Sequence, residues 1–102
     1  MDNKPVDQRI VSKVREVGEP IRAKGATRLY VYGSRGRGDH RPDSDLDVFV
    51  DYDEDSDFSI IELAGIKRML ESALNLGVHI TTRDGLSPFF KEEVEQQAVR
   101  VL

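Results

Sequence analysis

The chain has 102 residues, no cysteine and a formal charge of −4 at pH 7, with 38% hydrophobic and 33% charged residues. This length suits one small folded domain, so residues 1–102 are expected to form a single unit that packing alone stabilises, without disulfides or thiolate metal sites. The acidic charge argues against direct nucleic-acid binding, and no apolar run approaches the roughly 20 residues of a membrane span, so a cytoplasmic protein is expected.

The first predicted element is an amphipathic helix over residues 6–23. Its apolar residues recur at steps of three or four, which places them on one helix face: Ile10, Val14, Val17 and Ile21. Pro20 lies inside this pattern and is expected to kink or split the helix. Gly25 is expected to end it.

Two strands with a polar loop between them are predicted next. Leu29 and Val31 alternate with tyrosines up to Gly33, which is the period of a strand. Residues 34–44 are rich in Gly, Arg, Pro, Asp and Ser and are expected to form a loop. In the second strand Leu46, Val48 and Val50 face the core, and the other face carries Asp45, Asp47, Phe49 and Asp51.

A helix, a strand and a last helix complete the prediction. The acidic run at 51–57 is interpreted as a solvated loop, after which Ser59 and Glu62 have the spacing of a capping box. The helix is expected to end at Gly77 and to bury the following residues: Ile60, Leu63, Ile66, Met69, Leu70 and Ala73. In the third strand Val78 and Ile80 face inward and His79 and Thr81 outward. Ser87 and Pro88 are expected to open the last helix, with Phe89 and Phe90 either as core anchors or with one of them exposed to a partner.

This order of elements predicts an α/β (α+β) fold: a small mixed β-sheet with helices on one face. The uncovered face would carry Asp45, Asp47 and His79, where a site does not disturb the core. The loop must bring Gly33 back to the start of the second strand, so the first two strands are expected to be antiparallel neighbours.

The residues with the clearest chemical purpose are Gly33 and Ser34, followed after ten residues by Asp45 and Asp47. Glycine at a strand end allows close approach of a phosphate, and Ser34 with nearby amides can donate hydrogen bonds to it. Two carboxylates at spacing two on a strand project side by side and suit a hard divalent cation such as Mg²⁺.

Arginines in the same loop could supply further phosphate contacts. Arg35 and Arg37, together with Arg41, carry guanidinium groups whose geometry matches phosphate. The alternative is that they form exposed ion pairs with Asp39, Asp43 and Asp45, which contribute little to stability. We favour the phosphate role for Arg35 and Arg37.

With these residues, the segment GSRGRGDHRPDSDLDVFVD resembles the DNA polymerase beta-like nucleotidyltransferase superfamily, and in particular its minimal nucleotidyltransferase branch. The resemblance implies a substrate, ATP, and a cofactor, Mg²⁺ or Mn²⁺, held by Asp45 and Asp47. It also implies an MntA-like antitoxin that adds AMP to a partner, a HEPN-domain ribonuclease toxin, or that neutralises this toxin by binding it.

The sequence departs from this family at one position. The family places a third carboxylate on a later strand, where this chain has His79 between Val78 and Ile80. His79 could bind Mn²⁺ or Zn²⁺, act as a general base beside the catalytic Asp45 and Asp47, or be an ordinary surface residue. The alternative function is therefore a catalytically impaired binding antitoxin. Transfer to a small molecule is less favoured because no second domain forms its pocket, and association into a homo-oligomer is left open.

Overall fold

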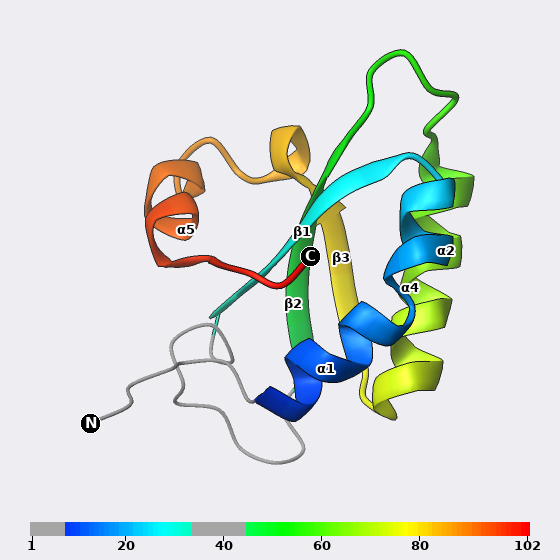
Figure 1. Ribbon diagram of the computed structural model, residues 1–102. Coiled ribbons are helices and arrows are strands. Elements are labelled where there is room, and N and C mark those ends of the chain that lie inside the picture. The colour runs from blue at the N-terminus through cyan, green and yellow to red at the C-terminus, as the bar shows by residue number, and fades with distance from the viewer. Residues whose placement is uncertain (1–7, 34–44) are drawn as a thin grey trace.

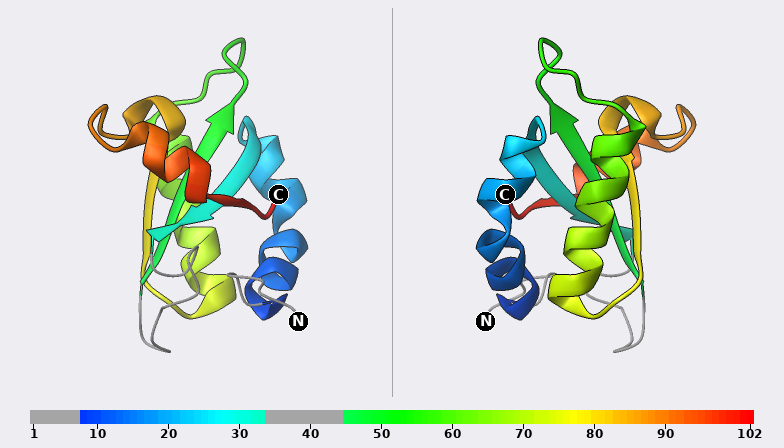
Figure 2. Two further views of the ribbon diagram at one scale, coloured as in Figure 1. Left: turned by 90° about the vertical axis from the view of Figure 1, so that its left-hand side faces the viewer. Right: turned by 90° about the vertical axis from the view of Figure 1, so that its right-hand side faces the viewer.

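The computed structural model describes residues 8–33 and 45–102. A sheet lies at the centre, with α1, α2 and α4 against one face and α5 on the opposite side (Figures 1 and 2). This is the mixed α/β fold expected from the sequence, and the fold class is confirmed. Within the described ranges, no helix is both long enough and apolar enough to cross a membrane.

The first helical segment is split into α1 (Gln8–Glu16) and α2 (Gly18–Ala23). Pro20 lies in the first turn of α2, where its missing N–H group would have no helical partner in any case. The break therefore precedes the proline, and both helices still bury the predicted face through Ile10, Val14 and Ile21. Gly25 follows α2 with a φ of 110°, a conformation that L side chains rarely adopt, which confirms it as the stop.

The four strands lie in the order β3-β2-β1-β4. β1 (Ala26–Tyr32) and β2 (Leu46–Tyr52) are antiparallel, as predicted, and β3 (Val78–Thr82) is parallel to β2. The sequence prediction missed β4 (Val99–Arg100), which pairs with Tyr30 and Val31 of β1. Two residues are too short a run to show the period of a strand, so the local sequence pattern does not reveal β4.

Helix α4 (Ile60–Leu74) connects the parallel strands β2 and β3. Its capping box is formed as predicted, with Ser59 accepting from the Ile61 amide and Glu62 accepting from the Ser59 amide at 2.8 Å. Two details were wrong. Ile60 is 79% exposed because it precedes the turn that packs on the sheet, and the helix ends at Asn75 in the left-handed conformation rather than at Gly77.

The capping box supports a stability prediction. Ser59→Ala removes the acceptor for one first-turn amide and the hydroxyl that contacts Glu62. We expect the free energy of unfolding to fall by about 1 kcal/mol, as for other N-cap replacements. Urea denaturation of the natural and variant chains measures this difference. The control is Ser72→Ala, an exposed serine inside the same helix, which should change stability little, and an equal loss in both variants would contradict the capping role.

The segment after β3 differs most from the sequence prediction. A single 3-10 turn, η1 (Arg83–Gly85), follows β3, and α5 (Lys91–Gln97) begins after Phe90 rather than at Ser87 and Pro88. The Phe90 amide donates to the Ser87 carbonyl, so these residues form a turn before the helix. Phe89 is 90% exposed and Phe90 60% exposed, so neither is a core anchor.

The face of the sheet opposite α4 is less open than expected. Phe49 is fully buried there, stacked on Tyr30 with ring centroids 4.8 Å apart and in contact with Tyr32. The Arg83 guanidinium lies 5.0 Å from the centroids of both Tyr30 and Phe49 and pairs with Asp51 and Glu95. This network connects η1 and α5 to the sheet. Asp45 and His79, at the end where β2 and β3 begin, remain exposed.

Candidate active site

Three neighbouring strands bring the candidate site together in one row. Tyr32 at the end of β1 pairs with Asp47 of β2, and Asp47 pairs with His79 of β3. Paired residues of adjacent strands project to the same side of a sheet, so these three side chains share one face. The sequence reasoning placed Asp47 and His79 on one face, and the structure places them side by side.

Gly33 stands directly against the carboxylate of Asp47. Its φ is 70°, and a Cβ built on it would lie 2.5 Å from Asp47 Oδ2. Any side chain at this position would strain the backbone and displace the carboxylate. The two ends of the predicted motif that the structure describes, Gly33 and Asp47, therefore meet in space.

Asp45 directly precedes β2, and its side chain lies next to His79 of β3. Its Oδ2 is 2.9 Å from His79 Nε2, and because a carboxylate only accepts, this contact needs a proton on Nε2. The side chains of His79 and Asp45 are 67% and 54% exposed. A Cβ on Gly77 would lie 2.6 Å from Asp45 Oδ1, so Gly77 also gives room to a carboxylate. The sequence pattern predicts only a helix stop at Gly77, although its place directly before a strand is also a signal for a close approach.

The two carboxylates differ in their surroundings. Burial raises the pKa of Asp47, with smaller opposing effects from His79, which lowers it, and Asp45, which raises it. Burial also raises the pKa of the Tyr32 hydroxyl, and the nearby Asp47 charge adds to this effect. The described site is thus partly desolvated at Asp47 and open to solvent at Asp45, which is an arrangement in which a bound cation would relieve the cost of the buried charge.

The donor set fits a hard divalent cation. Asp45 and Asp47 offer carboxylate oxygens, which Mg²⁺ prefers, together with water and substrate phosphate. Among the described residues no three His, Asp or Glu side chains form a group that could hold a metal ion without such additional ligands. The other predicted phosphate-binding residues, Ser34, Arg35 and Arg37, lie outside the described residues.

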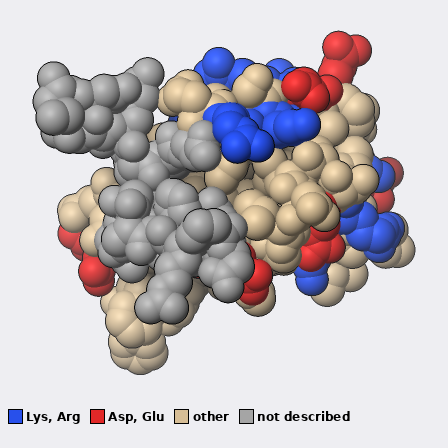
Figure 3. Space-filling view, turned by 90° about the horizontal axis from the view of Figure 1, so that it is seen from below, with Lys and Arg blue, Asp and Glu red and all other residues tan. Residues whose placement is uncertain are grey.

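Charges of both signs lie on the end of the molecule where β2 and β3 begin. Seen from below, Lys and Arg side chains lie in more than one place, with Asp and Glu side chains among them (Figure 3). The described surface at this end therefore has no uniform charge, in a chain whose net charge is −4.

The fold is that of a nucleotidyltransferase domain. The sequence model of the family described as "Nucleotidyltransferase domain" matches residues 6–101. The chain belongs to this family and, within it, to the minimal nucleotidyltransferase branch. Family membership supports a transferase activity.

Two curated relatives have the length and similarity to be informative. Protein adenylyltransferase MntA of Thermococcus cleftensis is 30% identical over 77 residues, which cover 76% of this chain and 76% of the relative. A Methanocaldococcus jannaschii protein provisionally named a protein adenylyltransferase is 29% identical over 93 residues, covering 90% of this chain and 98% of the relative.

Solved structures share the fold. One provisionally described as a minimal nucleotidyltransferase has a TM-score of 0.68 and 33% identity and covers 87% of this chain and 93% of its own. A toxin-antitoxin structure with AMP-PNP has a TM-score of 0.70 at 20% identity, covering 90% of this chain and 72% of its own. At that identity the second likeness concerns the fold alone.

Proposed function

We propose that the chain is an antitoxin that transfers AMP from ATP to a hydroxyl group of a HEPN-domain toxin. The observation that carries this proposal is the contact between Gly33 and the Asp47 carboxylate, in one row with His79 and beside Asp45. It is supported by the relatives named protein adenylyltransferase and by the similar fold of an MntA-HepT toxin-antitoxin structure. The association with AMP-PNP in another toxin-antitoxin structure is consistent with an adenine nucleotide.

The proposed reaction is a displacement at the α-phosphorus of ATP. The hydroxyl oxygen of the toxin forms a bond to this phosphorus, the bond to the bridging oxygen of the β-phosphate breaks, and pyrophosphate leaves. Gly33 gives the phosphates access to the strand end, and Asp45 and Asp47 would hold Mg²⁺. When bound, this cation supplies neutralisation of the triphosphate charge.

His79 is the proposed acceptor of the hydroxyl proton. In the neutral tautomer that carries its proton on Nε2, where it hydrogen-bonds Asp45, the second ring nitrogen, Nδ1, has a lone pair that can accept the proton. Asp45 fixes this tautomer, in the way that a carboxylate orients the imidazole in other acid-base pairs. The imidazole would thus take over a role in proton transfer where the family resemblance implies a carboxylate.

The test uses the cognate toxin, ATP and Mg²⁺, with mass spectrometry of the toxin. The natural chain should add AMP, and His79→Gln should lower the rate about a hundredfold, because an amide keeps the size but cannot accept the proton. Nucleotide affinity, measured by calorimetry, should stay unchanged. His79→Asp is the matched variant, since a carboxylate retains both proton acceptance and metal binding, and it should remain active.

A second candidate function is neutralisation of the toxin by binding alone. The hydrogen bond between His79 and Asp45 favours it, because this bond occupies a carboxylate oxygen that would otherwise bind the metal ion. The same experiment separates the two. If the natural chain leaves the toxin unmodified and His79→Asp modifies it, the natural chain acts as a binding antitoxin. In that case Asp45→Ala combined with Asp47→Ala should still neutralise the toxin.

A further inference from the structure

Two adjacent aromatic side chains project into solvent from the turn that precedes α5. Phe89 is 90% exposed and Phe90 60% exposed, although phenylalanine is among the residues most often buried in folded proteins. Leu86, at the start of the same segment, is buried. Aromatic residues are enriched where proteins bind one another, and they often dominate the affinity. The pair is therefore a candidate contact site for a protein partner.

The turn is held in place from both sides. The Phe90 amide donates to the Ser87 carbonyl at 3.0 Å, and the Val94 amide donates to the Phe90 carbonyl at 2.9 Å. Glu95 of α5 pairs with Arg83 at 2.7 Å, which connects the helix to the sheet. Because this backbone is already ordered, a partner that covers the rings has little entropy of ordering to overcome.

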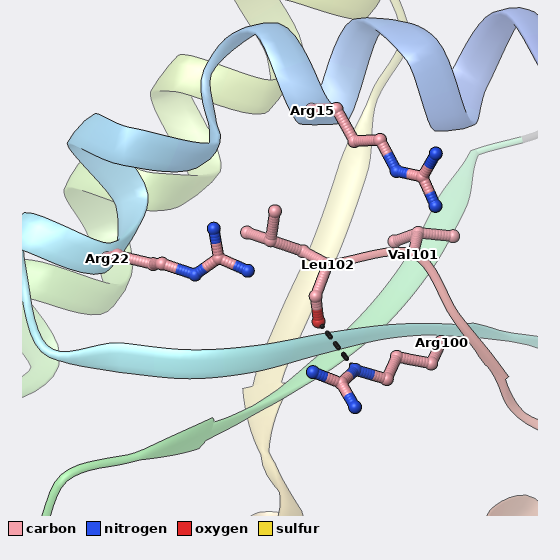
Figure 4. Close-up of a pocket in the computed structure, with 5 residues that line it drawn as sticks. All are labelled: Arg15, Arg22, Arg100, Val101 and Leu102. Carbon is pink, nitrogen blue, oxygen red and sulfur yellow. Dashed lines mark hydrogen bonds between the residues drawn. The ribbon is translucent and has the colours of Figure 1, made fainter.

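Exposed carboxylates border the two rings. Glu92 and Glu93 lie in the first turn of α5 and form no ion pair among the residues that the structure describes. The adjacent Lys91 lies in a pocket with Asp51 and Asp84. Three arginines lie elsewhere, around the cleft shown in Figure 4: Arg15, Arg22 and Arg100. The rings therefore stand in an acidic surface, which is complementary to an apolar pocket bordered by Lys and Arg.

This surface lies on the same side of the sheet as the candidate active site. Asp47 and Phe49 are two positions apart on β2, so their side chains project to one face. Phe49 lies against Arg83, which pairs with Glu95 of α5. Helices α1, α2 and α4 cover the other face (Figures 1 and 2). A partner that extends along the face of α5 can therefore contact the rings and also reach Asp47.

We infer that Phe89, Phe90, Glu92 and Glu93 form the docking surface for the toxin, which receives the rings in an apolar pocket bordered by Lys and Arg. The inference rests on the proposed function for the identity of this partner. The proposed toxin is a ribonuclease, and a protein that binds RNA needs cationic side chains along its phosphate-binding surface. An acidic surface with two exposed aromatic rings is complementary to such a partner.

The first test is calorimetric titration of the natural chain and its variants with the cognate toxin, without nucleotide. Phe89→Ala should weaken toxin binding about a hundredfold, because it removes a central aromatic contact. Urea denaturation should show unchanged stability, since the ring is exposed in the free chain. Ile60→Ala is the matched control: Ile60 is 79% exposed on α4, across the sheet, and its loss should leave the affinity unchanged. Equal affinities of Phe89→Ala and the natural chain would overturn the inference.

A double variant tests the carboxylates. Glu92→Gln combined with Glu93→Gln should lower the association rate about tenfold at low salt and reduce its dependence on ionic strength. The control is Glu16→Gln combined with Glu19→Gln, which removes the same charge from exposed positions on α1 and α2. Equal slowing by both double variants would show a general charge effect and contradict the proposed surface.

A photo-crosslinking residue, p-benzoylphenylalanine, in place of Phe89 identifies the occupant. Cross-links to a toxin peptide that contains Lys or Arg support the inference, whereas cross-links to a second copy of the chain, or none to the toxin, overturn it. The result is separable from AMP transfer. A natural chain that binds the toxin through Phe89 without modifying it retains the docking surface and contradicts the transfer. A chain that modifies the toxin, and whose Phe89→Ala variant binds it equally well, retains the transfer and contradicts the docking surface.

Discussion

Replacing Asp47 by asparagine is expected to reduce AMP transfer to the toxin about a thousandfold. Asp47 lies against Gly33 and is the more buried of the two carboxylates, so its charge would act on the triphosphate and the cation with less screening by water. Removing one preorganised electrostatic group from an active site typically lowers the rate constant by a factor of about 100 to 1,000. Rates are measured by mass spectrometry of the toxin at saturating ATP and Mg²⁺.

The same substitution should not destabilise the fold. Burial raises the pKa of Asp47 above its unfolded value, so its ionised form opposes folding at pH values above that unfolded pKa, and an uncharged amide removes this cost. Urea denaturation at pH 7 should therefore give an equal or higher free energy of unfolding. Asp55→Asn, in the exposed acidic loop, is the matched control for charge and should retain full transfer. Transfer by Asp47→Asn at the natural rate would remove Asp47 from the proposed site.

Replacing the partly buried Arg83 by alanine should lower the free energy of unfolding by about 3 kcal/mol. Arg83 forms a paired contact with Asp51, at 2.7 and 3.0 Å, and a third contact with Glu95 at 2.7 Å. Hydrogen bonds to charged groups contribute about 1.5–3 kcal/mol each. Among the residues that the structure describes, the loss would leave Asp51, whose side chain is 18% exposed, with a single 4.0 Å ion pair to Arg28. The unfolding free energy in urea measures the effect.

Two variants separate the geometry of Arg83 from its charge. Arg83→Lys retains the charge but cannot bind Asp51 through two parallel hydrogen bonds, so it should lose an intermediate amount of stability. Arg68→Ala removes an exposed arginine of α4 and should change the free energy of unfolding by less than about 0.5 kcal/mol. If Arg83→Ala lowers the free energy of unfolding no more than Arg68→Ala does, the contacts of Arg83 with Asp51 and Glu95 do not stabilise the fold.

The elements that sequence reasoning found are those with a repeated pattern or a specific cap. The period of β2 and the capping box of α4 both follow from contacts within a few residues, and both are confirmed. β4 and the burial of Phe49 depend on partners distant in the chain, such as Tyr30 and Arg83, so local patterns did not predict them. Local patterns did not predict the exposure of Phe89 and Phe90 either, because it depends on the position of their turn relative to the distant strands of the sheet.

For the site, the spacing of the motif predicted which residues lie close together, but it did not predict the hydrogen bonds between their side chains. The motif placed Gly33 and Asp47 together, and the structure confirms their contact. It gave no information on the hydrogen bond between Asp45 and His79, because the register between two parallel strands is set by the packing of the connecting helix α4. The role of Gly77 in giving room to Asp45 was missed for the same reason.

The parallel pairing of β2 with β3 has a consequence for the order in which the molecule assembles. Gly33 and Asp47 belong to an antiparallel pair of consecutive strands, whereas His79 meets Asp45 across 34 positions of the chain, after α4 has docked. Closing the longer loop costs more entropy before any contact repays it. A chain leaving the ribosome would thus complete the glycine-aspartate half of the site first, and the imidazole would arrive only when β3 pairs with β2.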